Sequence, residues 1–191
     1  MSVFEYIGVL ISVIMGLGIT HLVTGTSKLI QHRSEVRLYL PHMLWTLNIL
    51  IFILLIWWGM FNWNGHETWF AHEYLFITLY AIVMFFLASL LYPWDMANDI
   101  DVREHFFGNR TWFFGVLLVA WGIDVLATLV KADVGVRPVP TGYFGFIGIQ
   151  MLIAIIGIAS RNRIVHAILP TSFLVIVLSL VLFSAQNQIN G

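Results

Sequence analysis

Two ionisable side chains lie inside stretches of the sequence that are otherwise apolar. His21 lies within the run from 4 to 30, and Asp124 lies within the run from 111 to 130. Such groups are costly in hydrocarbon, so they usually face a bundle interior or a watery pocket and mark sites for ions, protons or polar solutes. The sequence therefore predicts that any chemistry of this protein depends first on Asp124 and then on His21.

Each of these residues has an amide at a similar depth on another expected helix. At a rise of 1.5 Å per residue, His21 and Asp124 lie about 10 Å from opposite ends of their helices. Asn48 is expected near the depth of His21, and Gln150 near the depth of Asp124. Hydrogen bonds of this kind contribute about 1 kcal/mol, and packing alone would explain them. The candidate polar path consists of Asp124, His21, Asn48, Gln150, Thr20 and Thr128.

The composition places these residues in a membrane. The chain has 191 residues, of which 60% are hydrophobic and 10% are charged, and its mean hydropathy is +0.90. Soluble domains have about 25% charged residues, so this composition predicts a polytopic membrane protein. Cysteine is absent and the net charge is −1, which gives no argument for thiol chemistry or nucleic acid. The first run lacks the features of a cleaved signal peptide, so we expect it to remain.

Six stretches are apolar enough to span a bilayer, which requires about 20 residues. They are expected at residues 4–30, 42–61, 74–92, 111–130, 143–160 and 164–183. The chain is thus predicted to be an all-α integral membrane protein, with residues 1–191 forming a single domain of six helices in one bundle. The link from 161 to 163 is so short that the last two helices must form an antiparallel hairpin.

Lysine and arginine predict the orientation of this bundle. Lys28, Arg33, Arg37, Arg103, Arg110, Arg161 and Arg163 fall on one side, whereas Lys131 and Arg137 fall on the other. The basic side is expected in the cytoplasm and both termini outside, in a bacterial inner membrane. Trp57, Trp58, Trp63 and Trp69 are expected at the outer interface, and Trp45, Trp94 and Trp112 at the inner one.

Small residues recur along the first apolar run. Residues four apart lie on one slowly drifting helix face, and small side chains let helices approach closely in a bilayer. The predicted packing positions are Gly8, Ser12, Gly16, Gly18 and Gly25. We expect the first helix to be central in the bundle. The alternative is that this face forms a homo-oligomer seam or lines a cavity.

Two pairs of segments resemble each other. Residues 18–24 and 122–128 share Gly, Ile, Leu and Thr, and the amides within 46–51 and 148–153 fall at nearly the same offset. Three helices per half would invert the second half in the membrane. The pattern suggests an inverted repeat of three plus three helices, a recurrent device in transporters. Chance similarity between apolar segments is the alternative.

A proline interrupts the sixth stretch. Pro170 removes a backbone donor there, so we expect a kink, either for packing or as a hinge.

The loop after the third stretch is expected to contain a short helix. Asp95 or Asp99 is expected to cap it, and it should end near 108–109.

Histidines suggest two further sites. His66, His72 and Glu73 are weak candidates for a metal site, with an ordinary wet interface as the alternative. The histidines expected toward the cytoplasm are His21, His32, His42, His105 and His166. Two of them on facing helices could ligate haem b, although the leading expectation is that no cofactor is bound.

Three classes of function remain open. The first is an ion or small-solute channel or transporter with a polar path near Asp124 and His21. The second is a structural or assembly subunit of a membrane complex, and the third is a membrane haem or redox protein. No nucleotide loop or nucleophile elbow is present, so an enzyme is not expected. The expected partners are the lipid bilayer and either further copies of this chain or other members of a membrane complex.

Overall fold

A computed structural model of the chain describes residues 3–33, 36, 38–64, 66, 69–95 and 101–189, with side chains as far as 182. Within these residues the chain forms six α-helices and one short 3-10 helix. They are α1 (Val3–Gln31), α2 (Leu40–Met60), η1 (Phe61–Trp63), α3 (Ala71–Ser89), α4 (Val102–Asp133), α5 (Tyr143–Ala159) and α6 (Arg163–Ile189).

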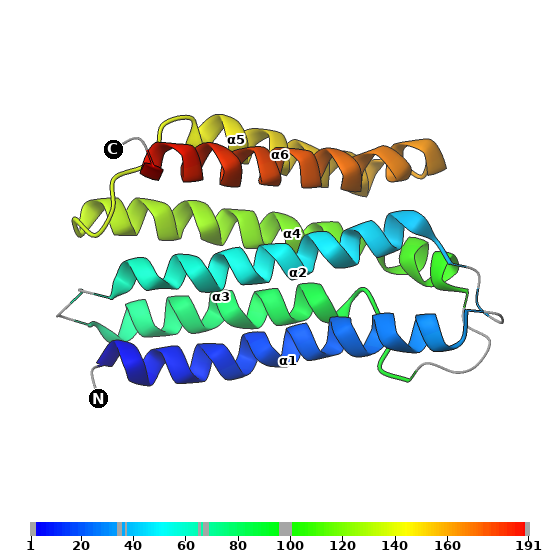
Figure 1. The fold of residues 1–191 in the computed structure, drawn as a ribbon, viewed down its shortest axis with the longest axis horizontal. Helices are drawn as coiled ribbons and strands as arrows, with labels where there is room; N and C mark the ends of the chain where they lie inside the picture. Colours follow the sequence, from blue (N-terminus) through cyan, green and yellow to red (C-terminus); the bar gives the residue numbers. More distant parts are fainter. Residues whose placement is uncertain are drawn as a thin grey trace.

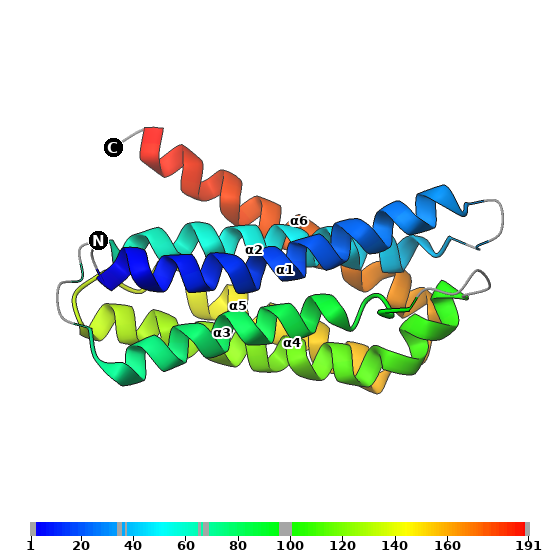
Figure 2. The same ribbon diagram turned by 90° about the horizontal axis from the view of Figure 1, so that it is seen from below.

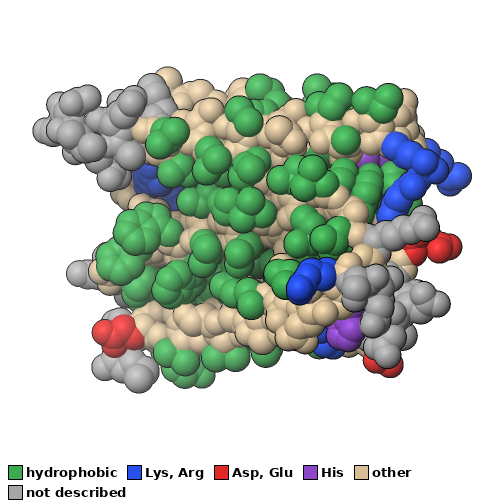
Figure 3. All heavy atoms as spheres, turned by 45° about the vertical axis from the view of Figure 1, so that its right-hand side comes forward, with side chains coloured by type: hydrophobic (Ala, Val, Ile, Leu, Met, Phe, Trp, Pro, Cys, Tyr) green, Lys and Arg blue, Asp and Glu red, His purple; other side chains and the backbone are tan. Residues whose placement is uncertain are grey.

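The helices have the length and composition of membrane spans. Five of them are long and apolar enough to cross a bilayer. The sixth, α5, has 17 residues, which gives about 26 Å at 1.5 Å per residue, close to the 30 Å of a hydrocarbon core. Hydrophobic side chains cover the flank of the bundle, and charged ones gather mainly toward its ends (Figure 3). The prediction of an all-α membrane protein is confirmed.

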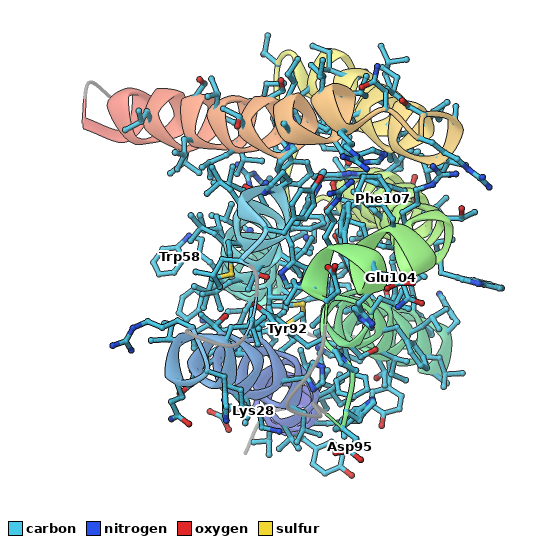
Figure 4. All side chains as sticks on the ribbon, turned by 90° about the vertical axis from the view of Figure 1, so that its right-hand side faces the viewer. Lys28, Trp58, Tyr92, Asp95, Glu104 and Phe107 are labelled. Atoms are coloured by element: carbon cyan, nitrogen blue, oxygen red, sulfur yellow. The ribbon has the colours of Figure 1, made fainter. Side chains whose placement is uncertain are left out.

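Successive helices run in opposite directions, so both termini lie at one end of the bundle (Figure 1). Seen along the bundle, α1 lies beside α3, and α5 beside α6 (Figure 4). Figure 2 shows α6 crossing α2 obliquely. The helix that contacts most of the others is α2, which packs against α1, α3, α4 and α6. The expectation of a central first helix is therefore wrong, because α1 lies at an edge and packs mainly against α3.

The packing of the two halves differs. An inverted repeat would pair α4 with α6 as α1 is paired with α3. Instead α1 and α3 form the most extensive helix pair, while α4 packs mainly against α5 and α6 mainly against α2. The suggested inverted repeat is therefore not a feature of this packing, and the short sequence matches reflect the small alphabet of apolar segments.

The loop expected after the third span is largely helical. α4 begins at Val102, and its cap is Asp101, whose Oδ1 accepts hydrogen bonds from the backbone N–H groups two and three residues later, at 2.9 and 3.1 Å. The expected break at 108–109 is wrong, because a glycine inside a helix costs only about 1 kcal/mol. Asp95 is exposed, and Asp99 lies outside the described residues.

Aromatic side chains fill the centre of the bundle. The fully buried Trp45 of α2 lies edge-on to Phe113, Phe114 and Phe173, with ring centroids 5.3, 5.2 and 5.3 Å away. Such edge-to-face pairs each contribute about 0.5–1.5 kcal/mol beyond the burial of apolar area. This aromatic core therefore joins α2, α4 and α6.

The tryptophans expected at the interfaces divide into two groups. Trp57, Trp58, Trp94 and Trp112 are exposed. Trp45 and Trp63 are buried instead, and Trp69 is half-buried against Phe4. Trp63 packs at the end of the bundle, where the Lys131 ammonium lies 5.7 Å from the centroid of its ring. Trp45 and Trp63 therefore pack against other helices, and their predicted depth at the two interfaces stays a prediction.

We expect Trp45→Ala to lower the free energy of unfolding by about 3–5 kcal/mol, because deleting a large ring from a packed core leaves a cavity. Trp58→Ala is the control on the same helix, since Trp58 is 76% exposed, and it should change stability by less than about 0.5 kcal/mol. Unfolding by SDS in mixed micelles, followed by circular dichroism, measures both. Equal losses would contradict the central place of Trp45.

Candidate functional site

Asp124 lies on α4 toward the end of the bundle that carries both termini, between hydroxyl groups of two other helices. Its Oδ1 accepts a hydrogen bond from the Tyr80 hydroxyl of α3 at 3.1 Å, and its Oδ2 accepts one from the Tyr143 hydroxyl of α5 at 2.7 Å. Both carboxylate oxygens thus have a donor. The arrangement ties α3, α4 and α5 together through one acidic group.

Further polar groups surround this carboxylate. The Thr128 side chain lies one turn along α4, near Tyr143, and the Lys131 ammonium lies near enough to interact with the charge of Asp124. Tyr80 is buried, whereas Asp124 and Tyr143 are half-buried, so the carboxylate is reachable from outside the core. Hydroxyl and carboxylate oxygens at such a place can hold a proton or a small hard cation.

The amide predicted beside Asp124 does not pair with it. Gln150 is fully buried on α5, and both its Oε1 and its Nε2 lack a hydrogen-bond partner. The sequence analysis missed the two tyrosines that take this place. A usable signal was present, because a buried tyrosine hydroxyl usually finds a partner and Asp124 is the one carboxyl group in the interior of the predicted spans, away from their ends.

Tyr92 organises the opposite end of the bundle, where it lies between α1 and α2 (Figure 4). Its hydroxyl bridges Thr26 of α1 and Thr46 of α2, at 3.0 Å from each. Its ring lies against Gly25, where any Cβ would overlap it. Its carbonyl oxygen lies 3.0 Å from Nε2 of His21. Tyr92, three residues after the end of α3, therefore contacts both α1 and α2.

Histidines contact the carbonyl groups of the turn that follows α3. Buried carbonyl groups past the end of a helix need donors where water is absent. Nε2 of His42 lies 2.7 Å from the carbonyl oxygen of Leu91, next to the contact between His21 and Tyr92. Imidazoles from α2 and α1 thus hold the turn after α3.

Two other histidines of this end have similar roles. Nε2 of His166 lies 2.9 Å from the carbonyl oxygen of Ser160 after α5, which also accepts a hydrogen bond from Arg110 at 2.8 Å. Nδ1 of His32 lies 3.0 Å from the carbonyl oxygen of Lys28. Four of the five histidines considered for haem b therefore contact backbone carbonyl groups at or near helix ends, and His105 contacts Asn109 one turn along α4.

Asn48 links α2 to the proline turn of α6. Its Nδ2 donates to the carbonyl oxygen of Pro170 at 2.8 Å, and both residues are buried. The predicted pair of Asn48 with His21 is therefore wrong, because His21 is taken up by the turn after α3. Pro170 lies inside a continuous α6, so the carbonyl four residues before it lacks the usual helical donor.

The small residues of α1 fall on two faces. Gly18 and Gly25 lie on the buried face, where Gly18 packs on α2 and α3. A Cβ added at Gly8 or Gly16 would meet nothing within 4 Å, so neither contacts another helix. Ser12 is exposed and accepts a hydrogen bond from Trp57 at 3.2 Å. Thr20 of the candidate polar path is also exposed, away from the core.

The residues of the weak metal candidate cap a helix. An oxygen of Glu73 accepts a hydrogen bond from the backbone N–H of Phe70 at 2.9 Å, and its carboxylate lies 3.3 Å from Nε2 of His66. His72 is exposed and stacks on Phe70. Across the ranges that the structure describes, no group of three or more histidine and acidic residues could hold a metal ion.

The polar residues do not form one continuous path. Asp124 and its tyrosines lie toward one end and His21 toward the other, and the aromatic core fills the bundle between them. Comparison with known protein families, with curated proteins and with solved structures finds no match for this chain.

Gly25→Ala should destabilise the protein by about 1–3 kcal/mol, because the added methyl group overlaps the Tyr92 ring in a packed interface. Gly16→Ala is the matched control on α1, where the new methyl group meets open space. There alanine should be neutral or stabilise the helix by up to about 1 kcal/mol. Thermal unfolding in detergent compares the two variants, and a similar response to both would refute this role of Gly25.

Proposed function

We propose that this protein is a small membrane transporter or channel for protons or small cations, with Asp124 as the group that binds them. The observation that supports this is the placement of a single carboxylate in a membrane span between two tyrosine hydroxyls from other helices. Intramembrane carboxyl groups are functional sites by default, since burying them without a role is costly.

The hydrogen bonds of Asp124 provide a means to couple binding to movement. As a carboxylate, Asp124 accepts from both tyrosines and donates to neither. A proton on one oxygen makes that oxygen a donor and a much weaker acceptor, so its hydrogen bond from Tyr80 or from Tyr143 weakens. Protonation would thereby loosen α4 from α3 or α5. Because the aromatic core fills the centre, we expect passage across it to require such helix movement.

The basic end of the bundle sets its orientation in this proposal. Arginines of α4 and of the α5–α6 link lie at the end opposite the two termini, as does Lys28 of α1. We place that end in the cytoplasm of a bacterial cell, so that Asp124 opens toward the outside.

A second candidate function is that of an assembly subunit. It is favoured by Gly8 and Gly16 of α1, where an added Cβ would meet nothing within 4 Å, although Ser12 between them contacts Trp57 of α2. Such a face suits the close approach of a helix from another copy. Native mass measurement of the wild type and of Gly16→Leu tests whether copies of the chain associate. A monomeric mass for both proteins would rule out the assembly function.

Asp124→Asn should abolish proton or sodium flux into proteoliposomes, because an amide keeps the size of the side chain but cannot bind and release a proton. Asp133→Asn is the control, since Asp133 is an exposed carboxylate at the end of the same helix. Flux is followed with an internal pH dye and with radioactive sodium. Wild-type flux in Asp124→Asn, or no flux of either ion in the wild type, would overturn the proposal.

A further inference from the structure

A cleft of about 700 Å³ opens at the basic end of the bundle, where α4 begins and α5 meets α6. Its charged lining residues are Arg103, Arg110, Arg161, Arg163, Asp101 and Glu104. Four guanidinium groups thus face two carboxylates. Figure 4 looks onto this end, with Glu104 and Phe107 labelled on the first turns of α4, and Figure 3 shows basic side chains gathered there.

Within the part of the chain that the structure describes, the two carboxylates of this cleft balance only half of its positive charge. Among the residues that the structure describes, no carboxylate lies within 4.0 Å of any of these guanidinium groups. One of the two acids, Asp101, is already engaged by the backbone N–H groups that it caps. Arg110 is only 8% exposed and is held by the carbonyl oxygen of Ser160. The cleft therefore carries an excess of positive charge, with Arg110 held in place and Arg161 and Arg163 exposed.

Arginine clusters of this kind select phosphate. A guanidinium group is planar and donates two parallel hydrogen bonds to neighbouring oxygens of a phosphate or carboxylate group. Arg110 comes from α4, Arg161 from the α5–α6 link, and Arg163 from the start of α6. Donors from separate elements can surround a tetrahedral anion from several sides, which a flat surface cannot do.

The rim of the cleft identifies the source of the phosphate. Trp112 follows the lining residue Thr111 and is 71% exposed, and Ile164 follows the lining residue Arg163 and is 69% exposed. Both belong to helices that cross the membrane, so these apolar side chains face lipid. The site thus combines charge on its aqueous side with apolar surface on its hydrocarbon side, which is the polarity of a phospholipid.

We propose that this cleft binds the phosphate group of an anionic phospholipid, with the acyl chains lying along Trp112 and Ile164. Basic pockets between membrane helices on the cytoplasmic side are suited to such headgroups. The bound lipid would bridge the start of α4 and the α5–α6 hairpin. This site lies at the end of the bundle opposite Asp124, so it does not depend on the proposed transport.

Native mass spectrometry of the purified full chain in detergent, titrated with phosphatidylglycerol or phosphatidylcholine, tests this proposal. We expect tighter binding of phosphatidylglycerol, and about 25-fold weaker binding in the double variant Arg161→Gln/Arg163→Gln, since each basic residue near an anionic lipid contributes a factor of about five. The double variant Lys28→Gln/Arg33→Gln removes the same charge at the same end, outside the cleft, and should bind as the wild type does.

Two further measurements distinguish a phospholipid headgroup from free inorganic phosphate as the ligand. Trp112→Ser should weaken phosphatidylglycerol binding but leave any effect of inorganic phosphate on thermal stability unchanged. Stabilisation by inorganic phosphate without preference for the anionic lipid would replace a lipid site with a site for free phosphate. Equal binding of both lipids, or equal loss in the two double variants, would overturn the proposal. Circular dichroism confirms the fold, and Arg161→Gln alone replaces the double variant if the latter does not fold.

Discussion

The turn that follows α3 lies inside the bundle, and its backbone carbonyl groups must find donors there. Leu91 and Tyr92 are buried just after the helix, where water cannot serve them. Imidazoles of His21 and His42 supply the missing hydrogen bonds. Because these histidines come from α1 and α2, the need to satisfy this turn fixes the relative positions of three helices.

The aromatic core closes the interior of the bundle. Trp45 and the phenylalanines around it fill the space between α2, α4 and α6 with close edge-on contacts. A packed interior of this kind excludes a water-filled pore along the bundle as it stands. Asp124 and the histidines lie toward the two ends, whereas Asn48 and Gln150 are buried between them and form no continuous path. Any passage along the bundle therefore needs a change in helix packing.

The two ends differ in chemistry. One presents the single carboxylate Asp124 between tyrosine hydroxyls, and the other presents an arginine cleft beside histidine-capped helix ends. The first suits a proton or small cation and the second suits a phosphate group. The short α5 connects them, since Tyr143 at its start contacts Asp124 and Ser160 after its end accepts from Arg110.

The sequence by itself determined the membrane class, the six helices and their approximate bounds, because hydropathy and charge act locally along the chain. It also singled out Asp124 and His21, since ionisable groups in apolar runs are visible without a structure. Their partners depended on which helices touch, and short apolar segments do not encode this. Tertiary packing decided that α2 rather than α1 is central, and that histidines of other helices hold the turn after α3. It also paired Asp124 with tyrosines, because a hydrogen bond needs atoms within about 3 Å and sequence depth alone cannot specify that.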